Sequence, residues 1–124
     1  MAEPILREIL LAFWKVHILH HAAERPIYGQ WLLEELQRHG FQVSPGTLYP
    51  LLGRMQRAGW LQIVKSGAPT KSPKARREYV LTPKGAARLR QLRRQVEELH
   101  HEVIEEAQDA PPARSRRRDR GEPV

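Results

Sequence analysis

The sequence predicts a mainly helical chain with a small β-hairpin and a long last helix. Apolar residues recur at helical spacing in three consecutive segments between residues 4 and 57. Two short segments of alternating apolar and polar residues follow, at 60–65 and 76–82. After residue 83, apolar residues repeat with a spacing of three and four for about three heptads. This order of elements defines the fold class, and each element has its own local justification.

Bulk composition limits the classes of function. The 124 residues suffice for one small domain and a tail, and the net charge of +7 favours a polyanionic partner. The absence of Cys excludes disulfides and zinc sites built on thiolates. No apolar stretch reaches the roughly 20 residues that span a bilayer, and charges interrupt the N-terminal apolar run. We therefore expect a cytoplasmic protein with no membrane partner.

The first helix is predicted from Pro4 to about His21, with Pro4 at the first helical position. Its apolar residues cover more than one face of the helix, so two partners are needed. One is the domain itself, and a second subunit is the natural candidate for the other. Arg25-Pro26 ends this segment, because the residue before a proline avoids helical geometry.

The second helix is predicted from Tyr28 to about Arg38, with Gly40 as a stop signal. The third helix ends near residues 57–59, but its start is ambiguous. Ser44 could cap it with Pro45 at the first position, although Pro50 would then lie in the second turn. A proline inside a helix costs about 3 kcal/mol. We therefore favour a start between residues 46 and 48.

This third helix is the most informative segment. One face carries an apolar stripe, formed by Leu48, Leu51, Leu52 and Met55. No acidic residue occurs between residues 36 and 77, whereas eight basic residues do: Arg38, Arg54, Arg57, Lys65, Lys71, Lys74, Arg76 and Arg77. A helix within a basic region free of acids is typical of elements that read DNA.

The hairpin and the last helix complete the pattern. Residues 66–75 form a long basic turn between the two strands, and such a hairpin after a helix-turn-helix is a wing. Thr82 is the expected cap of the last helix, with Pro83 at its first position. The fold class is thus a winged helix-turn-helix plus a long C-terminal dimerisation helix. The expected divisions are 1–82 for DNA binding, 83–109 for dimerisation and 110–124 for a disordered basic tail.

Specific motifs resemble those of a known family. The chain is similar to the PadR-like transcriptional regulators, in particular the short subgroup with one C-terminal helix, over about residues 5–105. The matching motifs are Tyr28-Gly29, Leu33-Glu34-Glu35-Leu36, Ser44-Pro45-Gly46-Thr47-Leu48-Tyr49-Pro50-Leu51-Leu52, Met55, Ala58-Gly59-Trp60-Leu61, Arg76-Arg77-Glu78-Tyr79-Val80-Leu81-Thr82 and Lys84-Gly85. The resemblance implies a homodimeric repressor on a pseudo-palindromic double-stranded DNA operator, with an effector bound near the dimer interface.

These arguments nominate three groups of residues. Those expected to contact DNA are Tyr28, Ser44, Gly46, Thr47, Tyr49, Arg54, Arg57, Lys71, Lys74 and Arg76. Those expected at the dimer interface are Leu6, Leu10, Trp14, Leu89, Leu92, Val96, Leu99 and Val103. A small-molecule effector would contact Trp14 and Val96. For Tyr49 the alternative is packing against the preceding helix, and for the heptad stripe it is packing on its own domain.

Histidine spacing leaves another function open. His17 and His21 are four residues apart, as are Glu97 and His101, and such pairs can share a metal ion. A metal-responsive regulator using His17, His21 and His101 is therefore an alternative, against the reading that these are polar surface residues. Nonspecific nucleic-acid binding is a further alternative. No cofactor is expected, and no enzyme either, because no Cys nucleophile, phosphate-binding glycine loop or readable catalytic triad occurs.

Overall fold

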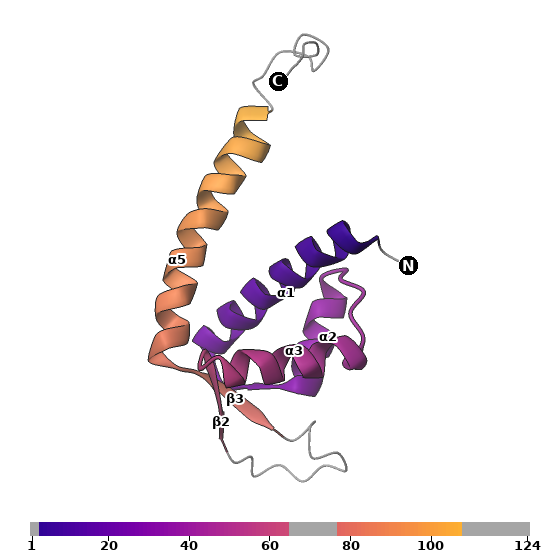
Figure 1. Ribbon diagram of the computed structural model, residues 1–124, viewed down its shortest axis with the longest axis vertical. Coiled ribbons are helices and arrows are strands. Elements are labelled where there is room, and N and C mark those ends of the chain that lie inside the picture. The colour runs from indigo at the N-terminus through magenta and orange to yellow at the C-terminus, as the bar shows by residue number, and fades with distance from the viewer. Residues whose placement is uncertain (1–2, 65–76, 108–124) are drawn as a thin grey trace. The chain divides into compact units, whose positions relative to one another are not determined.

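The computed structural model describes residues 3–64 and 77–107 (Figure 1). The chain divides into two compact units, Met1–Leu92 and Arg93–Val124. The first unit includes the beginning of the last helix, which the sequence had suggested was a separate dimerisation element. The elements are α1 (Pro4–Glu24), β1 (Ile27–Tyr28), α2 (Gly29–Arg38), α3 (Pro45–Arg57), β2 (Leu61–Val64), β3 (Glu78–Leu81), α5 (Pro83–Leu99) and the π-helical segment η1 (His100–Glu106).

The start of α3 differs from our expectation. The helix begins at Pro45 with Ser44 as its N-cap, although the Ser44 side chain makes no capping hydrogen bond. The Ser44 carbonyl instead accepts the N–H groups of Thr47 (3.1 Å) and Leu48 (2.9 Å). Pro50 is tolerated inside the helix because the carbonyl that it leaves without a donor belongs to Gly46, which is exposed to water. The start between residues 46 and 48 was therefore wrong.

A three-stranded antiparallel sheet lies beside the helices, with strand order β1-β3-β2. The pairs Leu61↔Leu81 and Ile63↔Tyr79 join the two predicted strands of the hairpin. The first strand, β1, differs from the sequence prediction, which gave Ile27 no element and placed Tyr28 at the start of the second helix. At two residues it is too short for any alternation, and its partner β3 is distant in sequence.

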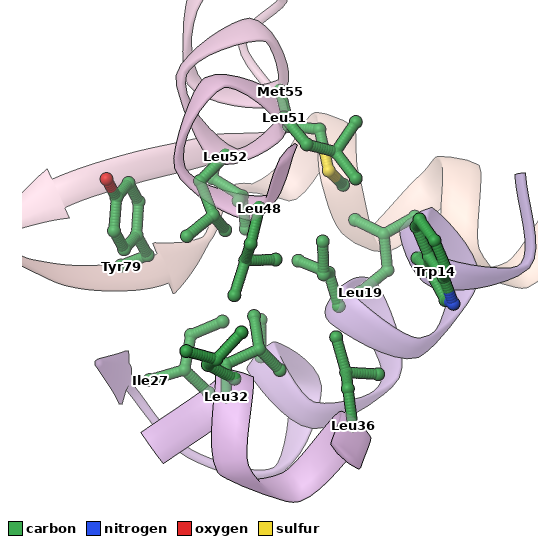
Figure 2. Close-up of a cluster of buried hydrophobic side chains, with 14 of the residues drawn as sticks. Trp14, Leu19, Ile27, Leu32, Leu36, Leu48, Leu51, Leu52, Met55 and Tyr79 are labelled. Carbon is green, nitrogen blue, oxygen red and sulfur yellow. The ribbon is translucent and has the colours of Figure 1, made fainter. Parts of the chain in front are cut away.

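Apolar side chains from α1, α2, α3 and the sheet meet in one core (Figure 2). The predicted inner stripe of α3 is fully or almost fully buried there. Leu19 of α1 and Leu36 of α2 contribute from the other two helices, and Tyr79 contributes from β3. Each fully buried side chain of this size contributes about 1.5–3 kcal/mol. The core therefore fixes which face of α3 points away from the protein.

Thr82 ties the start of α5 to the end of α3. Its hydroxyl accepts the N–H of Gly85 (2.9 Å), as predicted for the cap, and donates to the carbonyl of Gly59 (2.5 Å). Gly59 has a φ of +85°, which a residue with a side chain rarely adopts. The Thr82 hydroxyl thus caps the start of α5 and also binds the backbone that follows the end of α3.

The first part of the heptad stripe packs on its own domain. Leu89 is buried in the core, so it serves the chain's own fold rather than the predicted dimer contact, and the partly buried Leu92 packs against the core. Trp14 is likewise a core residue, with 4% of its surface exposed. Too little of Leu89 and Trp14 is exposed for contact with another chain or an effector. The sequence cannot distinguish packing on the chain's own core from packing on a second subunit, because both favour the same spacing of apolar residues.

The remainder of the stripe is exposed: Val96, Leu99 and Val103 all have about half of their surface accessible. The helix changes to π-helical geometry over His100–Glu106, where a continuous α-helix was expected. A π-helical turn holds more residues than an α-helical turn. The spacing of three and four therefore no longer defines one stripe in η1.

Gly85 should be the least replaceable glycine of the described residues. A Cβ atom at this position would overlap the carbonyl oxygen of Trp60 and lie 2.8 Å from Leu81 Cδ1. We expect Gly85→Ala to lower the free energy of unfolding by about 3 kcal/mol, because the obstacle is backbone. Gly46→Ala is the control, since its Cβ would meet only Ser44 Oγ at 3.7 Å. Urea unfolding of both variants would measure the difference, and equal stabilities would contradict the steric argument.

The buried Glu35 should make stability depend on acidic pH. Hydrogen bonds from Arg38 and from His39 (3.0 Å to Nε2) lower the pKa of Glu35 below its ordinary value of 4.5. Since the carboxylate is favoured in the folded state, its contribution is present above pH 4.5 and is lost as pH falls through the lowered value. Glu35→Gln should therefore destabilise the protein at pH 7 and approach the wild type in acid.

The control for this experiment is Glu34→Gln, which changes the exposed neighbouring carboxylate. Thermal unfolding between pH 3 and pH 7 would compare the three proteins. A Glu35→Gln deficit that stays constant across this range would contradict the proposed linkage.

Candidate nucleic-acid interface

The outward face of α3 begins at its first turn. Pro45, Gly46, Arg54 and Arg57 are exposed, while Thr47 is half-buried. The first N–H of the helix belongs to Gly46, because Pro45 has none, and the first N–H groups of a helix favour anions. The side chains of the first turn carry no acidic group. This end of α3 therefore offers a hydroxyl-bearing surface that suits a phosphate or a base edge.

Arg7 of α1 also reaches this turn. Its Nη2 donates to Thr47 Oγ1 (3.4 Å), which also accepts a hydrogen bond from Ser44 Oγ (3.4 Å). Both contacts are long, so the three side chains are held weakly and can exchange partners. Arg7 was not predicted as a site residue. No local pattern could reveal it, because Arg7 and Thr47 are 40 residues apart.

Tyr49 has a structural role on the flank of α3. A Cβ atom on Gly29 would collide with Tyr49 Cε1, so the ring occupies space that only a glycine leaves open. Partial burial raises the pKa of Tyr49. The packing alternative raised by the sequence therefore holds for the ring of Tyr49. The Tyr49 ring also borders a hollow of about 380 Å³, lined by Tyr49, Pro50, Gly53, Arg57, Arg77 and Tyr79.

This hollow joins α3 to the sheet. Two arginines line it, Arg57 from the last turn of α3 and Arg77, which immediately precedes β3. Both are exposed, and no acidic side chain lines the hollow. Arg77 was not among the predicted site residues. A polyanion lying along α3 would meet a positive charge at this point.

The hairpin itself is described only at its base. Lys71, Lys74 and Arg76, which were predicted to contact DNA, lie outside the described residues. Tyr28 is half-buried and belongs to β1, where it pairs with Glu78. Arg54 is exposed on α3, as expected for a phosphate contact.

The histidines nominated for metal binding lie in different units of the chain. His17 and His21 are on α1, and their rings are stacked with centroids 6.0 Å apart. His101 lies in η1, where Nδ1 is 3.0 Å from Glu105 and Nε2 is 3.2 Å from Glu106. These carboxylates raise the pKa of His101. A joint site of these three histidines stays a prediction.

The apolar residues nominated for dimerisation separate into two sets. Leu6, Val96, Leu99 and Val103 are exposed, whereas Trp14 and Leu89 are buried. Leu10 and Leu92 are partly buried and pack against the core. Of the two residues expected to contact an effector, Val96 is therefore exposed and Trp14 is buried.

Within the described residues, no helix is long and apolar enough to cross a membrane.

Known proteins share this arrangement. Residues 18–91, more than half of the chain, match the family described as Transcriptional regulator PadR-like family. The chain is 48% identical over 102 residues to the transcriptional regulator Rv3488 of Mycobacterium tuberculosis, covering 80% of this chain and 90% of the relative.

Solved structures agree with this match. A PadR-like transcriptional regulator from Bacillus cereus is 30% identical, with a TM-score of 0.68, over 86% of this chain and 98% of its own. A PadR-like transcription factor from Bacteroides fragilis is 27% identical, with a TM-score of 0.68, over 82% and 96%. The family consists of transcriptional regulators, in agreement with the expectation that the protein is not an enzyme. By sequence and by its winged-helix fold, the chain belongs to the PadR-like family of transcriptional regulators.

Proposed function

We propose that this protein is a homodimeric repressor that binds a pseudo-palindromic DNA operator in the cytoplasm and is released by an effector. The observation that carries the proposal is the outward face of α3. Its first turn carries no acidic side chain and is reached by Arg7 of α1 at Thr47, and Arg57 of its last turn lines one hollow with Arg77. A recognition helix inserts its N-terminal residues into the major groove. Ser44, Gly46 and Thr47 would then face base edges or phosphates.

The arginines have a different role in this proposal. Arg54 and Arg57 lie in the last turn of α3, and Arg77 borders the same hollow as Arg57. Contacts to phosphates position the protein without reading sequence. Lys71, Lys74 and Arg76 of the wing would extend this backbone contact. The Tyr49 ring supports the helix, and only its hydroxyl is proposed to reach DNA.

The first experiment measures sequence specificity. Fluorescence anisotropy would compare the DNA upstream of the protein's own gene with a scrambled duplex, at low and near-physiological salt. Preference for the upstream DNA that persists at higher salt would support a specific, autoregulating repressor. Equal binding that collapses with salt would contradict it and favour the nonspecific alternative.

Removal of one arginine tests the phosphate contacts. We expect Arg57→Gln to weaken binding to all duplexes by a similar factor and to reduce the slope of log K against log salt by about 1. Arg90→Gln is the matched control, because Arg90 is an exposed arginine of α5 outside the proposed interface. Equal slopes for Arg57→Gln and the wild type would contradict a contact at Arg57.

Exposed apolar residues support a dimer. On α1 these are Ile5, Leu6, Ile9 and Phe13, and on α5 and η1 they are Val96, Leu99, Val103 and Ile104. Apolar surface in patches of this kind marks contact sites between proteins. A second copy of the chain would cover both sets, and an effector that binds beside them would alter DNA affinity only by favouring one dimer geometry over another.

Charges introduced into this surface should separate the subunits. We expect Leu99→Lys combined with Val103→Lys to give a monomer, because each lysine would have to be buried without a partner. The wild type should be a dimer in sedimentation equilibrium. Ile63→Lys, at an exposed position of β2, is the control and should stay dimeric. A monomeric wild type, or a dimeric double variant, would contradict the proposed interface.

A further inference from the structure

Four of the six histidines gather where the end of α1 meets α2. The His20 and His21 rings have centroids 5.0 Å apart, and the His17 ring lies 6.0 Å from both His21 and His39. Burial, followed by repulsion from neighbouring imidazoles, lowers the pKa of His17 and of His21. The DNA-binding role proposed above uses none of the four histidines. The proposed DNA interface does not account for this cluster of imidazoles, so we considered what else it could bind.

His21 is the unusual member of this cluster. Only 8% of its surface is exposed, and neither ring nitrogen has a hydrogen-bond partner among the described residues. Its ring packs edge-on against Trp31, with centroids 5.4 Å apart. Oε1 of Glu24 lies 3.8 Å from Nδ1 of His21, too far for a hydrogen bond. Buried polar atoms normally have a hydrogen-bonding or metal partner, so the two ring nitrogens of His21 point to a ligand site.

Glu24 is shared with a second imidazole. Its other oxygen, Oε2, lies 3.5 Å from Nε2 of His20. His20, His21 and Glu24 thus offer one ligand atom each, all within 4.8 Å of one another. Tetrahedral zinc, with bonds of about 2.0–2.2 Å, holds its ligand atoms about 3.4 Å apart. To bind one zinc ion, these three atoms would have to approach one another to that spacing by rotation of their side chains.

We propose that His20, His21 and Glu24 form a binding site for a zinc-like divalent cation at the end of α1. Imidazole nitrogens with one carboxylate are a donor set that zinc accepts, with a fourth position left for water. The cation would occupy the unpartnered side of His21 and replace the long contacts to Glu24. This set differs from the one that the sequence suggested, since it needs neither His101 nor Glu97.

The protonation state of the site is compatible with a cation. Metal ligation requires neutral imidazole. Burial lowers the pKa of His21, which is the direction that favours the neutral ring. Glu24 brings the negative charge that offsets part of the cation's charge. Arg25, the adjacent cation, lies with its guanidinium carbon 4.9 Å from the centre of the Trp31 ring.

Metal binding would act on the stability of the DNA-binding unit. His21 packs against Trp31 of α2, so a cation held by His21 would fix the last turn of α1 beside that helix. It is not required for the DNA contacts proposed above, and its test uses no DNA. Failure of one proposal therefore leaves the other standing.

The experiment is a titration of the untagged full-length protein with zinc chloride at pH 7.5, followed by calorimetry. A polyhistidine tag would itself bind the metal and must be absent. We expect one site per chain and a higher melting temperature with zinc. His20→Ala combined with Glu24→Gln should weaken binding by at least about tenfold, because two of three ligands are removed. Both side chains are about half exposed, so the variant should fold, and circular dichroism would verify this.

The matched control is His100→Ala combined with His101→Ala, which removes the adjacent histidine pair of η1. This variant should bind zinc as the wild type does. Three results would overturn the proposal: no zinc binding by the wild type, unchanged affinity in the His20 and Glu24 variant, or loss of binding only in the η1 variant.

Discussion

Burial of the apolar stripe of α3 is the constraint on which the rest of the structure depends. Leu48, Leu51 and Leu52 are completely enclosed by α1, α2 and the sheet. Because the helix has only one such stripe, burying it leaves a single orientation for the opposite face. The exposed first turn and the two arginines of the last turn are consequences of that orientation. None of the exposed residues of the candidate interface belongs to the core.

Glycines and hydroxyls make the close contacts that this orientation needs. Gly29 leaves space for the Tyr49 ring, and Gly85 lets α5 approach the backbone of Trp60. Thr82 holds the same junction by capping α5 and bonding to Gly59 at the end of α3. Each of these residues belongs to a motif that resembles the PadR-like family. Their physical role is to position α3 and the sheet relative to each other within the first unit.

The apolar stripe of the last helix has two parts, one packed on the chain's own core and one exposed, and its regular spacing does not reveal where one part ends and the other begins. Leu89 and Leu92 complete the core, while Val96, Leu99 and Val103 lie exposed beyond it. A continuous spacing of three and four therefore describes two different surfaces in succession. The division between the two units falls within α5, just after Leu92. This is where the stripe stops serving its own domain and becomes available to a partner.

Local patterns in the sequence determined the helices, the hairpin strands, the Thr82 cap, the inner stripe of α3 and the family. These features depend on residues within one or two turns of each other, where spacing alone fixes the geometry. Tertiary structure decided the rest: the pairing of β1, the burial of Trp14 and Leu89, and the contact between Arg7 and Thr47. It also brought His39 beside His17. Such features join residues that are far apart in the chain or choose among equally apolar partners, and no local pattern encodes that choice.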